Sequence, residues 1–114
     1  MSQTKSIVFN NGRSFDLELK SSFFQKLRGL LGVQYLEEKQ GIVLAKCRQV
    51  HTFGMKFPID IVVLSREGVV IDFVGDLKAN KISRYYKDSY YIIELVASHL
   101  NKQLFKKDQI IEFN

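Results

Sequence analysis

The amino-acid sequence predicts a mainly β fold of the α+β class, with a compact curled antiparallel sheet or barrel of about six or seven strands and two short helices. Three observations support this prediction. The 114 residues are enough for one domain, so residues 1–114 are taken as a single domain. Strand-length apolar or alternating segments are separated by turn residues, and only two segments have helical spacing. A doubly wound sheet would need more helices between its strands.

The first predicted element is a β-hairpin. Residues 5–9 and 13–19 flank an Asn-Asn-Gly sequence, which is a turn signal between two apolar segments. In residues 13–19, apolar and polar side chains alternate. This alternation predicts a strand with one buried and one solvated face.

Two segments have the spacing of short amphipathic helices. For residues 22–31, Ser21 or Ser22 can cap the helix and Gly32 can stop it. Residues 97–105 form the second predicted helix, with Leu100 and Leu104 on its inward face.

The remaining segments predict strands. Residues 41–45 and 59–64 are continuous apolar runs, which are typical of strands buried on both faces. An Arg-Glu-Gly turn follows residues 59–64, so residues 59–74 are predicted to form a second hairpin. Residues 90–95 predict another strand and residues 109–113 a closing strand.

Composition limits the classes of function. With 46% hydrophobic and 25% charged residues, the chain resembles average globular proteins and is expected to have a real core. Its formal charge of +5 favours anionic partners weakly and is below that of dedicated nucleic-acid binders. A single cysteine, the lack of a signal-peptide pattern and the lack of a long apolar run predict a cytoplasmic protein without a transmembrane segment.

The richest chemistry lies in residues 47–60, Cys-Arg-Gln-Val-His-Thr-Phe-Gly-Met-Lys-Phe-Pro-Ile-Asp. Pro58 favours an extended residue before it and is tolerated at the start of a strand. Asp60 is therefore predicted to lie where a buried strand begins. A buried carboxylate is costly unless it is paired or hydrogen-bonded, so Asp60 needs partners. The candidates are loop amides and the side chains of Arg28, Arg48, His51 and Lys56.

This segment and three others resemble a known prokaryotic family. The other motifs are Lys-Leu-Arg-Gly-Leu-Leu-Gly at 26–32, Gly-Ile-Val-Leu at 41–44 and Tyr-Ile-Ile-Glu-Leu at 91–95. Together they resemble the family called domain of unknown function 192, over about residues 13–113. The resemblance implies a small β-rich domain without an established activity. It points to Arg28, His51, Thr52, Met55, Lys56, Pro58, Asp60 and Glu94.

Catalysis and metal binding have weaker support. Cys47 and His51 could form a nucleophile and base, but an extended chain would separate them by roughly 13 Å. Only a bend between them would bring them together, so we expect Cys47 to be structural and assign no catalytic residue. The two histidines and one cysteine do not have zinc-site spacing, and we expect no metal and no cofactor.

A polar cluster at one end of the sheet is the sharper hypothesis for function. It assigns ligand binding to Arg28, His51, Thr52, Lys56 and Asp60. The structural alternative is that Asp60 binds loop amides while His51 and Lys56 point to water. Glu94, in an apolar segment, either faces solvent or pairs with a cation such as Arg28.

The leading functional interpretation is a non-catalytic accessory module that binds a small anionic ligand or a protein. The alternatives are an enzyme acting on a small anionic substrate and a weak nucleic-acid binder. The last rests on residues 78–91, where lysines and one arginine are interleaved with tyrosines. Asp76 and Asp88 dilute this positive charge, so nucleic acid is the less favoured partner.

Overall fold

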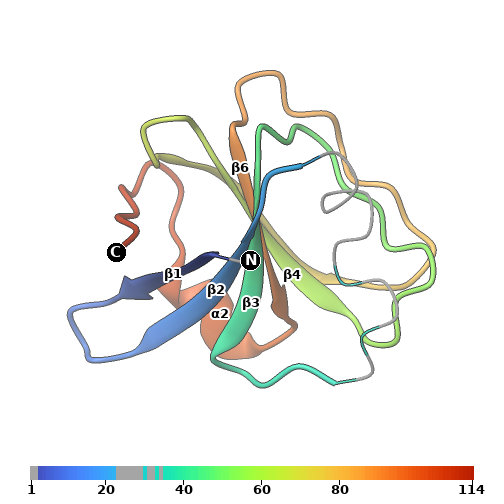
Figure 1. Cartoon of the computed structure of the whole chain (residues 1–114), viewed down its shortest axis with the longest axis horizontal. Helices are drawn as coiled ribbons and strands as arrows, with labels where there is room; N and C mark the ends of the chain where they lie inside the picture. Colours follow the sequence, from blue (N-terminus) through green and yellow to red (C-terminus); the bar gives the residue numbers. More distant parts are fainter. Residues whose placement is uncertain (1–2, 23–29, 31–32, 34) are drawn as a thin grey trace.

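The computed structural model describes residues 3–22, 30, 33 and 35–114. In chain order, its elements are β1 (Gln3–Val8), β2 (Ser14–Lys20), β3 (Gln40–Ala45), β4 (Ile59–Leu64), β5 (Val70–Leu77), β6 (Tyr91–Val96) and α2 (His99–Leu104). Figure 1 shows the strands as a twisted sheet with α2 beside it. The mainly β class predicted from the sequence is confirmed.

The sheet is mixed and open. Its strand order is β1-β2-β3-β6-β4-β5, so β1 and β5 are the two edges. All neighbours are antiparallel except β2 and β3, which are parallel. The predicted antiparallel arrangement is wrong for β2 and β3, and the barrel, which was the alternative to a curled sheet, does not form because β1 and β5 remain edges. A parallel pair needs a long connection, and residues 21–39 provide one between β2 and β3.

Strand β6 occupies the centre of the sheet because it inserts between β3 and β4. Ile93 lies opposite Val43 on one side and Val62 on the other. The neighbouring residue of each strand faces the opposite way, so a second cluster forms around Ile42, Ile61 and Ile92. Buried apolar residues on both faces confirm the prediction that 41–45 and 59–64 are doubly buried strands.

Both predicted hairpins are present. The first closes at Gly12, and the second, between β4 and β5, closes at Gly68; both glycines have a φ of +88°. A Cβ on Gly68 would also lie 2.5 Å from the backbone oxygen of Ile111. Glycine is required there because another residue would combine an unfavourable φ with a steric clash.

The C-terminal segment does not form the predicted closing strand. It makes one isolated bridge, between Ile110 and Val69. Its later backbone bonds go to two places: Ile111 N donates to Gly68 O (2.8 Å), and Asn114 N donates to Ser6 O (2.9 Å). No continuous ladder forms because the segment changes partner within a few residues.

Helix α2 is the only helix among the described residues. Ser98 caps it by accepting a hydrogen bond from Leu100 N (3.2 Å). The predicted inward position of Leu100 is wrong, because this side chain is 38% exposed while Asn101 is 2% exposed. Asn101 has a buried hydrogen-bond partner that holds this face of the helix inward. The first predicted helix, 22–31, falls mainly on residues outside the described part. No helix in the described ranges is long and apolar enough to span a membrane.

Candidate functional site

Asp60 is a buried carboxylate that joins three parts of the fold. It is the second residue of β4 and only 2% exposed. Its Oδ1 accepts a hydrogen bond from Asp76 N (2.8 Å), at the end of β5. Its Oδ2 accepts from Ser98 N (3.0 Å), at the start of α2, and from Asn101 Nδ2 (2.9 Å). These bonds tie β4, β5 and α2 together, so the structural alternative of loop-amide partners describes Asp60 well.

Asn101 is the partner that sequence reasoning missed. Its Nδ2 also donates to Val96 O (3.0 Å), so one amide group links α2 to Asp60 and to β6. One feature of the sequence could have indicated this role. Asn101 is a polar residue within 97–105, the segment predicted to form a helix with leucines on its inward face. A buried carboxylate needs hydrogen-bond donors and a buried amide NH₂ needs acceptors. The bond between Asn101 and Asp60 meets both needs.

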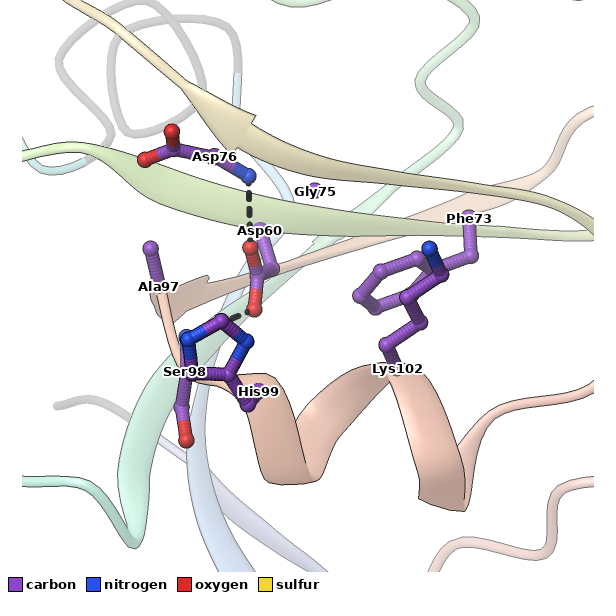
Figure 2. Close-up of a pocket in the computed structure, with 8 residues that line it drawn as sticks. All are labelled: Asp60, Phe73, Gly75, Asp76, Ala97, Ser98, His99 and Lys102. Atoms are coloured by element: carbon purple, nitrogen blue, oxygen red, sulfur yellow. Dashed lines mark hydrogen bonds between the residues drawn. The ribbon is translucent and has the colours of Figure 1, made fainter.

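A hollow of about 500 Å³ opens beside Asp60 (Figure 2). Its lining comes from β4, β5, the two residues before α2 and α2 itself: Asp60, Phe73, Gly75, Asp76, Ala97, Ser98, His99 and Lys102. Figure 2 shows Lys102 extending from α2 toward the Phe73 ring, with His99 near Ser98 and Asp60. The side chain of Asp76 binds Lys78 at 3.1 Å in an exposed ion pair. The hollow thus combines an apolar ring, a lysine and a histidine with a buried carboxylate whose two oxygens both accept hydrogen bonds from the protein.

Thr52 lies outside this hollow. It is completely buried, and its Oγ1 donates to Lys78 O (2.6 Å) and accepts from Lys81 N (2.9 Å). Its backbone N also donates to Lys81 O (2.8 Å). Thr52 therefore holds residues 78–81 against the 47–60 segment.

The other predicted ligand residues do not meet at Asp60. His51 is half-buried, and its Nδ1 accepts a hydrogen bond from Phe53 N (3.3 Å). Lys56 is exposed. Among the described residues, no hydrogen bond or ion pair joins either side chain to Asp60. Arg28 lies outside the described residues.

Cys47 is buried, with 9% of its surface exposed. Its Sγ donates to the backbone oxygen of Gln49 (3.3 Å), while the His51 ring nitrogen is bonded to Phe53 N. The interactions described for these two residues therefore do not form a nucleophile–base pair. No cluster of three or more potential metal ligands occurs in the described part of the chain.

We expect the Cys47 thiol to react slowly in the native protein. Burial restricts access by reagents, and reaction requires an accessible thiolate. Labelling with a chromogenic disulfide reagent should be slower than that of a free small-molecule thiol and should become fast in denaturant. Native labelling as fast as the free thiol would contradict a structural role for Cys47.

Glu94 is a second buried carboxyl group, on the opposite face of the sheet from Ile93. It is 3% exposed and lies between Ile42 and Ile61 on the neighbouring strands. Its Oε1 has no hydrogen-bond partner among the described residues. Burial raises the pKa of this carboxyl from 4.5 to about 8. Of the two predicted alternatives for Glu94, solvent exposure is therefore wrong.

Tyr86 anchors the long connection between β5 and β6. It is 9% exposed, and its hydroxyl donates to Asp72 Oδ2 (2.6 Å). Burial, and then this hydrogen bond, raise the pKa of Tyr86 to about 12. The connection is therefore held to β5 by a short bond from a buried ring.

Tyr86→Phe is expected to lower the free energy of unfolding by about 1–2 kcal/mol, because it removes a hydrogen bond to a carboxylate. Urea unfolding at neutral pH measures this effect. Tyr85→Phe is the matched control, since Tyr85 is 62% exposed and should tolerate the change. Equal stability of the two variants would mean that the Tyr86 bond contributes nothing to folding.

These features define a class: a small, mainly β domain with a six-stranded mixed sheet and a buried aspartate that fastens a short helix. The chain belongs to the family described as DUF192, Uncharacterized ACR, whose model matches residues 6–113. The resemblance inferred from the motifs is thus confirmed. No curated protein matches the chain.

Two solved structures share this fold. One is a protein of unknown function from Novosphingobium aromaticivorans, with a TM-score of 0.81 and 14% identity over 97% of this chain and 84% of that one. The other, from Sinorhizobium meliloti, is described as a "putative transcription regulator" and has a TM-score of 0.77. It is 18% identical over 99% of this chain and 94% of that one. At these identities, the similarity concerns the fold alone.

Proposed function

We propose that the protein is a non-catalytic binding module and that the hollow beside Asp60 takes a small anionic ligand with an apolar part. The observation that carries this proposal is the lining of the hollow, in which Lys102 extends toward the Phe73 ring and His99 lies near Ser98 (Figure 2). A ligand carboxylate can bind the lysine while its apolar part packs on the ring.

The state of the two lining carboxylates supports an anionic ligand. Asp60 is buried and accepts three hydrogen bonds from the fold, and Asp76 is paired with Lys78. Lys102 has no such counter-charge among the ion pairs of the described residues. The hollow therefore retains a cation for a ligand.

The bonding of Asp60 also favours binding over catalysis. A general base needs an oxygen that can reach a substrate proton. Both Asp60 oxygens already accept hydrogen bonds from groups of the protein itself. Of the residues predicted from the sequence, Asp60 therefore supports this site, while His51 and Lys56 do not belong to it.

A nuclear magnetic resonance titration with benzoate tests the proposal, with benzamide as its neutral counterpart. We expect benzoate to shift the amide signals of residues 75–76 and 97–102, with a dissociation constant on the order of millimolar for so small a probe. Benzamide should shift them much less. Benzoate signals spread over the whole surface, or no response at these amides, would contradict the proposal.

The matched variants are Lys102→Ala and Lys106→Ala. Both remove one exposed lysine, but only Lys102 lines the hollow. We expect Lys102→Ala to weaken benzoate binding several-fold and Lys106→Ala to leave it unchanged. Equal effects of the two changes would show that benzoate responds to net charge alone.

A further inference from the structure

Two segments that are distant in the sequence form one surface away from the Asp60 hollow. Residues 48–57 and residues 78–87 lie side by side, as the green and the yellow-to-orange loops of Figure 1 show. Their backbones are joined by bonds from Thr52 N to Lys81 O, Ser83 N to Val50 O and Tyr86 N to Arg48 O, each 2.8 Å long. We call residues 48–57 and 78–87 the paired-loop surface.

The paired-loop surface concentrates the positive charge of the chain. It holds six of the 17 Lys and Arg residues and none of the 12 Asp and Glu residues. The remaining 11 basic and 12 acidic residues nearly cancel, so this surface accounts for the formal charge of +5. All six basic residues are exposed: Arg48, Lys56, Lys78, Lys81, Arg84 and Lys87. One of them, Lys78, is paired with Asp76.

Exposed aromatic and apolar side chains lie among these cations. Phe53 is 47% exposed and Tyr85 62% exposed. The Phe53 ring lies 5.5 Å from the ring of His51, which is the bridge partner of Ile82. A single exposed apolar side chain is common on protein surfaces, but exposed rings grouped with several cations are typical of a binding surface.

We propose that the paired-loop surface binds single-stranded nucleic acid. The lysines and arginines neutralise phosphates, and unpaired bases stack on Phe53 and Tyr85. A duplex hides its base faces and would leave these two rings without partners. His51 and Lys56, which the sequence assigned to a small-ligand site, belong to this surface.

The pairing of the two segments makes nucleic acid a stronger candidate than residues 78–91 do alone. Residues 78–91 contain Asp88 and lie two residues after Asp76, and both aspartates reduce the positive charge of this segment. Pairing with residues 48–57 adds Arg48, Lys56 and an exposed ring without adding any acidic group. None of the residues of the paired-loop surface lines the hollow beside Asp60.

Fluorescence anisotropy with a labelled 20-residue oligothymidylate tests the proposal. We expect binding at low salt. If roughly four phosphates are neutralised, the logarithm of the dissociation constant should rise by about 3 for each tenfold increase in salt concentration. A duplex of the same length should bind more weakly. Absence of binding at low salt, or a duplex that binds equally well, would overturn the proposal.

Two pairs of substitutions separate this surface from general charge. The double variant Lys81→Glu, Arg84→Glu should weaken oligothymidylate binding by more than tenfold. Its control, Lys106→Glu, Lys107→Glu, has the same net charge but lies outside the surface, and should have a much smaller effect. Equal losses in the two would mean that only overall charge matters and would refute the surface.

Stacking is tested by Phe53→Ala with Tyr85→Ala, which is expected to weaken binding about tenfold without changing the salt slope. Unchanged affinity would overturn the stacking interaction and with it the preference for single strands. Vesicles of phosphatidylglycerol test the alternative partner. Binding to vesicles that these variants abolish, with no binding to oligothymidylate, would replace nucleic acid by a membrane surface. Lys102→Ala should leave oligothymidylate binding intact, which keeps this test independent of the small-ligand proposal.

Discussion

Asp60→Asn is expected to lower the free energy of unfolding by about 2–4 kcal/mol. Asparagine keeps the shape of the side chain but replaces one acceptor oxygen with an NH₂ donor. An NH₂ group in the place of Oδ2 would face the N–H groups of Ser98 and Asn101. We therefore expect the amide to keep its oxygen at that position and to point its NH₂ toward Asp76 N. That orientation loses one hydrogen bond and leaves a backbone N–H without an acceptor. Urea unfolding measures the loss, and faster hydrogen exchange at the Asp76 amide locates it.

Two controls accompany this variant. Asp76→Asn also neutralises an aspartate, but its carboxylate binds only an exposed lysine, so we expect a change within about 0.5 kcal/mol. His51→Ala should leave stability nearly intact if His51 serves a binding surface. An unaffected Asp60→Asn protein would refute the role of Asp60 as the link between β4, β5 and α2. A badly destabilised His51→Ala protein would give His51 a structural role.

The second large effect is expected at Glu94, as a dependence of stability on pH. Its pKa is raised from 4.5 to about 8 because the carboxyl is buried. Below pH 4.5, the folded and unfolded chains both keep the proton. Between pH 4.5 and 8, the unfolded chain has lost the proton and the folded chain retains it, so this group makes stability fall as pH rises. The total decrease is on the order of 5 kcal/mol.

Glu94→Gln isolates this contribution because glutamine resembles the protonated acid and does not titrate. We expect the variant and the wild type to be about equally stable at pH 4 and the variant to be more stable by several kcal/mol at pH 8–9. Unfolding in urea at a series of pH values measures the difference, in which the titration of all other groups largely cancels. A difference that is constant from pH 4 to pH 9 would show that Glu94 titrates at the same pKa in both states.

The predictability of the candidate site differs between Asp60 and its partners. Pro58 and the apolar run after it placed Asp60 at the start of a buried strand, and the cost of burying a carboxylate required hydrogen-bond donors. The sequence did not predict which groups would be those donors. Asn101 lies 41 positions away and is brought to Asp60 only because α2 packs beside β4. His51 and Lys56 are closer in sequence, yet the chain carries them to residues 78–87.

The sequence by itself determined the local structure: both hairpins, the doubly buried strands and the class of the fold. Side-chain periodicity and turn glycines act over a few residues, so they can be recognised from the sequence alone. Only the tertiary structure decided that β2 and β3 run parallel, that β6 lies between β3 and β4, and which groups bind Asp60. It also joined residues 48–57 to residues 78–87, two segments that together contain six basic residues and no acidic one. These features depend on contacts between distant segments, whose pairing is selected by the packing of the whole sheet and not by any local pattern.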